Sequence, residues 1–334
     1  MQKSRAVPAI GTGALASTVL AATALTGCSV QAPGSQAEGD QPVVLTTFTV
    51  LADMAENVAG DHLQVESITK PGAEIHGYEP TPGDITKASS ADLILDNGLN
   101  LEVWFEQFVA EADADHVVVT DGIDPIDITE DADAGLPNPH AWMSPENAHI
   151  YVDNMAEAFA ELDPDHAEDY RANAEAYQEQ LQDIQDELIA ELDQVPEQQR
   201  ALVTCEGAFS YLAEDAGLTE QYIWPVNADE EATPQQIAET IEFVSDNDVP
   251  AVFCESTVND QAMQQVVSAT DAEFGGTLYV DSLSEEDGPV PTYLDLLRHD
   301  AETIAAGLRG DTDGGDNTDG ADNTDDTEEG ETSA

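Results

Sequence analysis

Short apolar runs alternate with longer stretches of helical spacing along most of the chain. The runs are rich in β-branched and aliphatic residues, which predicts buried strands. Apolar residues three and four positions apart predict helices with one buried face. The links between these elements are too short to form separate domains. This alternation favours an α/β fold in which helices cover both faces of parallel sheets.

The alternation occupies two parts of the chain, which we expect to be two α/β lobes at residues 43–145 and 196–309. In the first lobe the expected strands are 42–51, 62–69, 91–96 and 117–120, and the expected helices are 52–59, 84–90 and 101–111. In the second lobe the expected strands are 201–205, 222–224, 251–254 and 277–280, and the expected helices are 208–216, 233–247, 259–269 and 293–308. No sequence repeat relates the lobes, so the architecture is repeated in kind only.

Between the lobes, residues 146–195 have a helical pattern throughout. One helix is expected at 146–162 and a longer one at 164–192. Apolar residues of the longer helix fall three or four positions apart, at Tyr170, Ala174, Tyr177, Leu181, Ile184, Leu188 and Leu192. A stripe of this kind ordinarily packs in the core. At roughly seven turns the helix is also long enough to join one lobe rigidly to the other.

The N-terminus has a different pattern. Lys3 and Arg5 precede a weakly apolar run that Gly, Ser and Thr interrupt, and small residues lead to Cys28. The run is too short and too polar for a membrane span, so residues 1–27 are predicted to be a secretory signal peptide. The Leu-Thr-Gly-Cys sequence that ends at Cys28 resembles a bacterial lipobox, which implies lipidation of this cysteine. Such a chain is exported and anchored on the outer face of the cell membrane.

Two further stretches cannot form a core. Residues 28–42 are rich in Gly, Ser, Pro and Gln, which is typical of a flexible tether. Residues 310–334 contain no apolar residue larger than alanine, so we expect a disordered acidic tail. Scattered carboxylates on a flexible chain bind metal weakly, and solvation is the simpler role for this tail.

The charge balance is extreme, with 70 acidic residues, 8 basic residues and a formal net charge of -62. Nucleic acid and anionic substrates are therefore not expected as partners. Two interpretations of the acids remain open: a field that draws cations toward the protein, or a solvated surface suited to a saline habitat. The second fits most of these residues better, because salt limits the range of such a field.

Two of the three cysteines end strand-like runs in the second lobe. Cys205 ends the run 201–205, and Cys254 ends the run 249–254. If Cys28 carries lipid, this even pair remains in an exported and oxidising setting. The carboxyl ends of neighbouring parallel strands would bring the two sulfur atoms together. We therefore expect a disulfide between Cys205 and Cys254.

Four residues with metal-ligand chemistry follow expected strands or lie on loops at the edge where ligands collect in α/β sheets. They are His76, His140, Glu206 and Asp281, two from each lobe. Each also has a simpler interpretation. His76 can cap a turn, and His140 can be a loop residue with no functional role. Glu206 can cap the helix that follows it, and Asp281 can be an N-cap. Together, the four residues would allow one ion to bridge the lobes.

The loop that carries His140 is expected to be stiff. Pro139 favours extended geometry at Asn138, and Ser144 and Pro145 supply the N-cap and the first residue of the next helix. Little conformational entropy then remains to be lost when His140 binds an ion.

Several motifs in a fixed order resemble a known family. They include His76-Gly77-Tyr78-Glu79-Pro80, Ala91-Asp92-Leu93-Ile94, Asn97-Gly98-Leu99-Asn100-Leu101-Glu102, His140-Ala141-Trp142-Met143-Ser144-Pro145, Glu206-Gly207-Ala208-Phe209-Ser210-Tyr211-Leu212 and Phe253-Cys254-Glu255-Ser256. Residues 43–308 are similar to the metal-binding lipoproteins of ABC importers for manganese, zinc or iron. The resemblance implies two α/β lobes joined by one long rigid helix, with the metal site in the cleft between them. The ligands that it implies are His76, His140, Glu206 and Asp281.

The resemblance also concerns the choice of metal. In the zinc branch of the family the position of Glu206 is usually histidine, and a histidine-rich loop commonly precedes the second ligand. The stretch 123–138 of this sequence contains no histidine. Two imidazoles with two carboxylates allow the five or six coordination of manganese or ferrous iron, whereas zinc prefers four ligands rich in nitrogen or sulfur. Mn²⁺ is therefore the expected ion, with Fe²⁺ and Zn²⁺ as alternatives.

The resemblance implies capture of this ion outside the cell and its delivery to an ABC permease that a cytoplasmic ATPase powers. The chain is expected to be a monomer. It is not expected to be an enzyme, because the sequence marks no substrate pocket or general base. An extracellular metalloenzyme and a surface adhesin are the competing functions. Glu79, Asp84 and Glu255 are candidates to accept the free ring N–H of a ligating histidine.

Overall fold

The computed structural model describes residues 41–105, 114–129, 133–226 and 232–311. The expected signal peptide, the lipidation residue Cys28, nearly all of the tether and the acidic tail from residue 312 lie outside the described residues. Among the helices that are described, none combines the length and the apolar character needed to cross a membrane.

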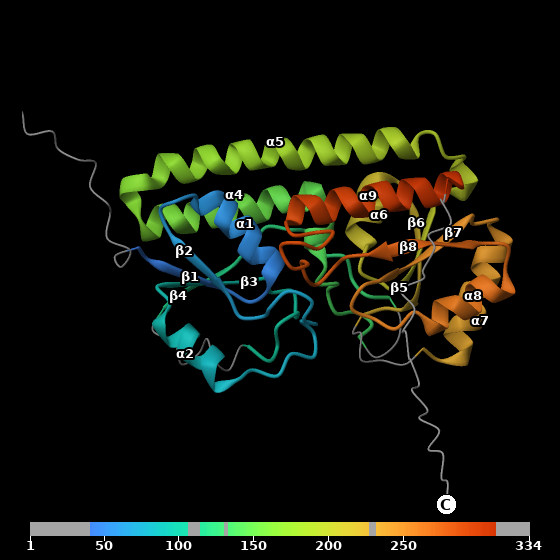
Figure 1. Cartoon of the computed structure of the whole chain (residues 1–334), viewed down its shortest axis with the longest axis horizontal. Helices are drawn as coiled ribbons and strands as arrows, with labels where there is room; N and C mark the ends of the chain where they lie inside the picture. The colour runs from blue at the N-terminus through green and yellow to red at the C-terminus, as the bar shows by residue number, and fades with distance from the viewer. Residues whose placement is uncertain (1–40, 106–113, 130–132, 227–231, 312–334) are drawn as a thin grey trace, which may run out of the picture. The chain divides into compact units, whose positions relative to one another are not determined.

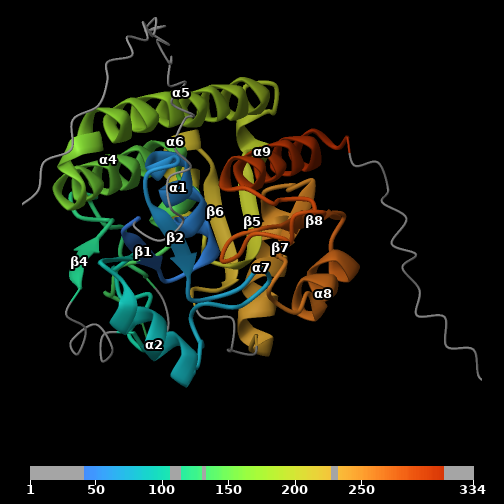
Figure 2. The same cartoon turned by 60° about the vertical axis from the view of Figure 1, so that its left-hand side comes forward.

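The first lobe is built on a parallel sheet with the strand order β2-β1-β3-β4. Its strands are β1 (Val43–Thr46), β2 (Gln64–Ser67), β3 (Leu93–Asp96) and β4 (Asp115–Val118), and its helices are α1 (Thr49–Ala59) and α2 (Pro82–Ser90). Successive residues of β1 face opposite sides of the sheet. Val44 packs in the cluster that contains α1, and Leu45 packs with Ala88 of α2. Figures 1 and 2 show the two helices on opposite faces, which confirms the expected covered sheet.

The apolar run at 42–51 is not one strand, so this expectation was wrong. β1 ends at Thr46, and α1 begins at Thr49 after the extended residue Phe48, whose φ and ψ are -145° and 169°. The next two residues of the helix, Val50 and Leu51, are fully buried. The boundary is marked only by buried threonines, which also suit a strand, so the apolar pattern does not show where the helix begins.

Two other expectations in this lobe need correction. β4 begins before the apolar run 117–120, because Asp115 and His116 pair with β3 although their side chains are exposed. The helix expected at 101–111 is not seen at residues 101–105, which form turns, and residues 106–111 lie outside the described part. Leu99 and Asn100 precede these turns with positive φ values of 49° and 70°, a conformation that interrupts a helix.

A layer of two long helices lies along both lobes. α4 (Pro145–Leu162) and α5 (Ala167–Leu192) form a hairpin through the short 3₁₀ turn Pro164–His166. Every apolar residue of the expected stripe is buried in α5. Figure 1 shows α5 passing over both lobes, where it contacts α1 and α4 in one part and α6 and α9 in the other. One long helix therefore joins the lobes, as the sequence predicted.

The second lobe is also built from parallel strands and helices, but its described strands form two two-stranded sheets. Its described strands are β5 (Ala201–Glu206), β6 (Thr219–Trp224), β7 (Ala251–Glu255) and β8 (Glu273–Leu278), and its described helices are α6 (Ser210–Ala216), α7 (Pro234–Asp246), α8 (Gln261–Ala269) and α9 (Tyr293–Arg309). β5 pairs with β6, and β7 pairs with β8, both in parallel. β5 and β7 lie side by side, and the expected disulfide between Cys205 and Cys254 joins them with Cα atoms 4.9 Å apart.

β8 lies earlier than the expected strand at 277–280, so this expectation was wrong. Two glycines interrupt its apolar pattern and conceal it in the sequence. A side chain at Gly275 would lie 2.4 Å from the Phe253 ring of β7, because the ring occupies that space. As a consequence, Asp281 lies in the loop after the strand and does not follow the strand directly.

Hydrogen bonds join the two lobes at this loop. The N–H of Gly72 donates to Ser282 Oγ at 2.7 Å, and the N–H of Leu283 donates to Thr49 Oγ1 at 3.0 Å. We call residues 281–283 the interlobe segment. It belongs to the second lobe by sequence, but the first lobe supplies the partners that hold it.

Candidate metal centre

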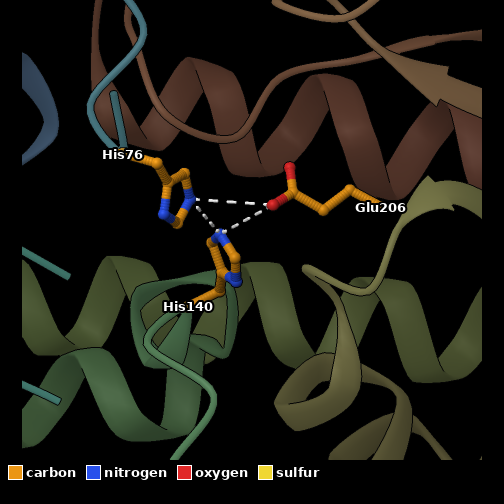
Figure 3. A group of neighbouring side chains, drawn as sticks. All are labelled: His76, His140 and Glu206. Atoms are coloured by element: carbon orange, nitrogen blue, oxygen red, sulfur yellow. Dashed lines mark hydrogen bonds and ion pairs between the residues drawn. The ribbon is translucent and has the colours of Figure 1, made fainter. Parts of the chain in front are cut away.

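The four expected ligand side chains lie together between the lobes. The Nε2 atoms of His76 and His140 are 3.0 Å apart. Glu206 Oε1 lies 3.7 Å from the first of these nitrogens and 3.8 Å from the second. Asp281 Oδ1 lies 3.9 and 3.8 Å from the same two atoms. Figure 3 shows both imidazole rings and the Glu206 carboxylate turned toward one another.

These separations are those of atoms around a single cation. Ligand bonds of about 2.1 Å at tetrahedral angles place the ligand atoms about 3.4 Å apart. The side chains of His140, Glu206 and Asp281 are fully buried, and that of His76 is 7% exposed. The arrangement can therefore hold one ion in a site that is nearly closed to water.

Local sequence fixes His140 in the way that the proline-rich loop predicted. Ser144 caps α4 by accepting a hydrogen bond from the N–H of Asn147 at 2.9 Å, and Pro145 is the first helical residue. On the other side of His140, Asn138 Oδ1 accepts from both the backbone N–H and the ring Nδ1 of the histidine, at 3.0 and 2.9 Å. A proton on Nδ1 leaves the Nε2 lone pair directed at the other ligands.

His76 lies on the loop after β2, where two contacts fix the backbone. Its N–H donates to Glu74 Oε1 at 2.9 Å, and the indole N–H of Trp104 donates to the carbonyl of Ile75 at 3.0 Å. Glu74 also offers an oxygen within reach of His76 and Asp281, so these three residues form a second group with metal-ligand spacing. Glu74 was not expected from the sequence, although it lies only two positions before His76.

The carboxyl groups at the site are buried, and their ionised forms would be stabilised by a nearby positive charge. Burial, followed by the charges of Glu74 and Glu206, raises the pKa of Asp281 well above its usual range. Asp281 Oδ1 has no hydrogen-bond partner within the described part of the chain. Glu255 Oε2 accepts from the backbone N–H of Glu206 at 3.2 Å, and burial raises the pKa of Glu255 to about 8. A cation at this point would offset both burial and repulsion.

The two histidines, in contrast, are held neutral. Burial lowers the pKa of His76 to about 4. Burial, followed by the charge of His76, lowers the pKa of His140 well below its ordinary value. Neutral imidazoles are the form that binds metal ions, so the rings need not lose a proton at physiological pH.

The expected partners of the ligating histidines need correction. Asp84 caps α2, where its Oδ2 accepts from the N–H of Thr81 at 2.7 Å and from the Tyr78 hydroxyl at 3.1 Å. Glu79 is exposed, and Glu255 bonds to backbone as described above. The residue that accepts the ring N–H of His140 is instead Asn138. The only feature of the sequence that could have indicated Asn138 is its position two residues before His140.

Two α/β lobes with a buried cluster of imidazoles and carboxylates between them define a substrate-binding protein for a metal ion. Residues 44–307 match the family described as ZnuA, the periplasmic component A of a zinc-uptake complex. The chain belongs to this family of metal-binding substrate-binding proteins.

Its relatives are named for different metals. The chain is 54% identical over 266 residues to the iron-binding protein YfeA of Yersinia pestis, which covers 79% of this chain and 86% of the relative. It is 38% identical over 283 residues to the manganese-binding lipoprotein MntA of Halalkalibacterium halodurans, covering 84% and 93%. The solved Mn-bound periplasmic metal-binding protein of Candidatus Liberibacter asiaticus has a TM-score of 0.76 at 40% identity, covering 80% of this chain and all of that one.

The family determines the class of activity. The protein is the metal-binding component of an ABC importer and not an enzyme, as the sequence resemblance implied. A permease and an ATPase are the partners that this class requires.

Proposed function

We propose that the protein captures one divalent transition metal ion, Mn²⁺ in the first place, through His76, His140, Glu206 and Asp281, and delivers it to its permease. The observation that carries the proposal is the convergence of donor atoms from both lobes at separations of 3.0 to 3.9 Å. Membership of a family of substrate-binding proteins supports the delivery step.

The donor set supports manganese. Two nitrogens and two carboxylates that can each bind through one or both oxygens suit the higher coordination of Mn²⁺ or Fe²⁺ better than the four-coordinate preference of Zn²⁺. The intrinsic order of affinities favours iron and zinc over manganese, so coordination geometry and metal supply must provide the selectivity. Relatives named for iron and for manganese agree with this donor set, and ferrous iron is the nearest alternative.

We further propose that the mature chain is exported and held on the outer face of the cell membrane by lipid on Cys28. The relative from Halalkalibacterium halodurans is named a lipoprotein, which supports this anchor. Residues 28–42 then act as a tether, and residues 43–145 and 196–309 act as the two lobes of a monomer. A tethered monomer searches a small volume near its permease, which raises its effective concentration there.

The closed geometry disfavours the competing metalloenzyme. A catalytic ion needs an open coordination position for water or substrate. Here the four candidate ligands come from two lobes, and at most 7% of any of their side chains is exposed. A buried ion of this kind is suited to being carried.

Metal content is the experiment that tests the proposal. The purified protein is stripped, offered equimolar Mn²⁺, Fe²⁺ and Zn²⁺ without oxygen, and analysed for bound ions and melting temperature. We expect about one manganese or iron ion per chain and a raised melting temperature, because an ion that binds only the folded state stabilises it. Glu206→Ala removes both effects, whereas Glu214→Ala, which changes an exposed acid outside the site, leaves them intact.

Two results would contradict parts of this function. Preferential retention of Zn²⁺ would overturn the choice of metal and leave the transport class in place. Absence of a stoichiometric ion in the unmutated protein would overturn the four-ligand site.

A further inference from the structure

A chain of hydrogen bonds leads from His140 away from the metal centre. It begins at Asn138, whose Oδ1 accepts from the His140 ring as described. The Nδ2 of Asn138 donates to the carbonyl of Gly207 at 2.6 Å and to Ser210 Oγ at 3.2 Å. The amide nitrogen carries two hydrogens, and two acceptors, the Gly207 carbonyl and Ser210 Oγ, together hold its orientation. The amide oxygen must then face His140.

The chain continues to a carboxylate. Ser210 Oγ lies 2.6 Å from Glu220 Oε2 and donates its single proton there. Ser210 Oγ therefore uses a lone pair to accept the hydrogen bond from Asn138 Nδ2. From Glu220 to His140, each group sets the donor or acceptor role of the next, and the last proton in the chain lies on His140 Nδ1.

Glu220 reaches this position because β6 pairs with β5, the strand that ends at Glu206. It lines a cavity of about 270 Å³ together with Asn138, Ser210, Glu214 and other residues. Glu220 Oε1 is buried and has no hydrogen-bond partner among the described residues. Burial raises the pKa of Glu220, and hydrogen bonds from Ser210 and from the backbone of Phe209 act in the opposite direction.

We propose that Glu220 is a positioning residue for metal capture, which acts through Ser210 and Asn138 to hold the His140 proton on Nδ1 and the Nε2 lone pair toward the ion. Metal-binding histidines generally give their other ring N–H to a carboxylate or carbonyl, which fixes the ring and raises its basicity. In this protein an amide and a hydroxyl separate that carboxylate from the ring. The inference rests on the proposed function, because it assigns His140 as a ligand.

The test measures the His140 tautomer and the metal affinity in the full-length protein. Ring ¹⁵N shifts of the metal-free, ¹⁵N-histidine-labelled protein report which nitrogen carries the proton, with the His140 signals identified by their loss in His140→Gln. Binding of Mn²⁺ alone gives the dissociation constant. The variants are Ser210→Ala and Glu220→Ala, which break the chain, and Glu220→Gln, whose amide oxygen still accepts from Ser210. Glu214→Ala is the matched control, because Glu214 lines the same cavity outside the chain.

We expect Ser210→Ala and Glu220→Ala to reduce the Nδ1–H population and to raise the dissociation constant for Mn²⁺ about tenfold. Glu220→Gln restores both, and Glu214→Ala changes neither. If the two chain-breaking variants keep the Nδ1–H tautomer and the affinity of the control, the role of Glu220 is refuted while the metal site stands. The tautomer is read without metal, so a protein that binds no Mn²⁺ refutes the proposed function independently of this result.

Discussion

At the scale of single residues, the candidate centre combines neutral imidazole nitrogens with buried carboxyl groups whose ionised form burial disfavours. His76 has a pKa lowered to about 4, and Asp281 has one raised well above its usual range. Both shifts have burial as their largest cause, and both remove charge from the cluster. An incoming cation therefore meets little competing positive charge. The number of oxygen ligands then decides which cation fits.

Replacing one carboxylate with imidazole should change the metal preference. We expect Glu206→His to lower the affinity for Mn²⁺ about tenfold or more and to retain the affinity for Zn²⁺, because three nitrogens and one oxygen suit four-coordinate zinc. Competition between the two ions, with bound metal quantified, provides the measurement. Glu214→His adds the same side chain at an exposed position and serves as the control. An unchanged ratio of the two affinities would contradict a selective role for the Glu206 carboxylate.

At the scale of elements, the disulfide links two strands directly beside the site. Cys205 and Cys254 immediately precede Glu206 and Glu255, the last residues of β5 and β7. The bond therefore restrains the ends of both strands where the carboxylates begin. It also closes a long loop in the unfolded chain.

Loss of this disulfide should destabilise the protein. With a sequence separation of 49 residues, chain entropy predicts that Cys205→Ala/Cys254→Ala lowers the free energy of unfolding by about 4 kcal/mol. Denaturant unfolding of the metal-free protein measures this change. Excess reductant should destabilise the unmutated protein similarly and leave the double variant unaffected. Equal stability of the oxidised and reduced protein would contradict the prediction.

The strands and helices differ in how well the sequence could predict them. Alternating apolar runs identified the strands and the long helix, because burial on two faces or on one stripe leaves a periodic pattern. The run at 42–51 and the glycine-interrupted β8 failed, because the first hides a helix start and the second depends on the Phe253 ring. Each is a tertiary effect on a local pattern.

Only part of the candidate site could be predicted from the sequence. The four candidate ligands could be named from the sequence, because their residue types lie at loops and strand ends and match family motifs. Their supporting groups could not be named. Ser210 is 72 positions from Asn138 in sequence, and nothing local marks Glu220 as its partner. Such contacts exist only once β5 and β6 have paired.

At the scale of the whole molecule, some of the many acidic side chains are buried in the two lobes and not exposed on the surface. Burial raises the pKa of both Glu102 and Glu255 to about 8. Glu102 lies in the first lobe, where it accepts from the Thr47 hydroxyl at 2.7 Å and from the N–H of Asn97 at 2.8 Å. Both carboxyls prefer to be protonated in the folded protein and ionise more readily in the unfolded chain. Stability is therefore linked to pH.

The metal-free protein should lose stability as the pH rises from about 7 to about 8 and level off above that range, because up to its pKa of about 8 the folded state binds more protons than the unfolded state. The stabilisation is present at low pH and is lost as the pH rises through the folded pKa of about 8. The buried histidines act in the opposite direction, but only below their ordinary pKa of 6.5. Melting temperatures at fixed high ionic strength measure the slope. Glu102→Gln should reduce it, and Glu187→Gln, at an exposed site on α5, should not. A flat or rising profile would contradict this linkage.

The interlobe segment should affect how long a bound ion stays in the site. Residues 281–283 carry one candidate ligand, and hydrogen bonds to Gly72 and Thr49 hold them against the opposite lobe. An ion enclosed in this way leaves only when several contacts open together, so its residence time should be long while the carrier diffuses alone. A docking partner that displaces this one segment would shorten the residence time greatly without any change in the ligands themselves. Tight retention during the search and rapid unloading at the membrane can then belong to the same molecule.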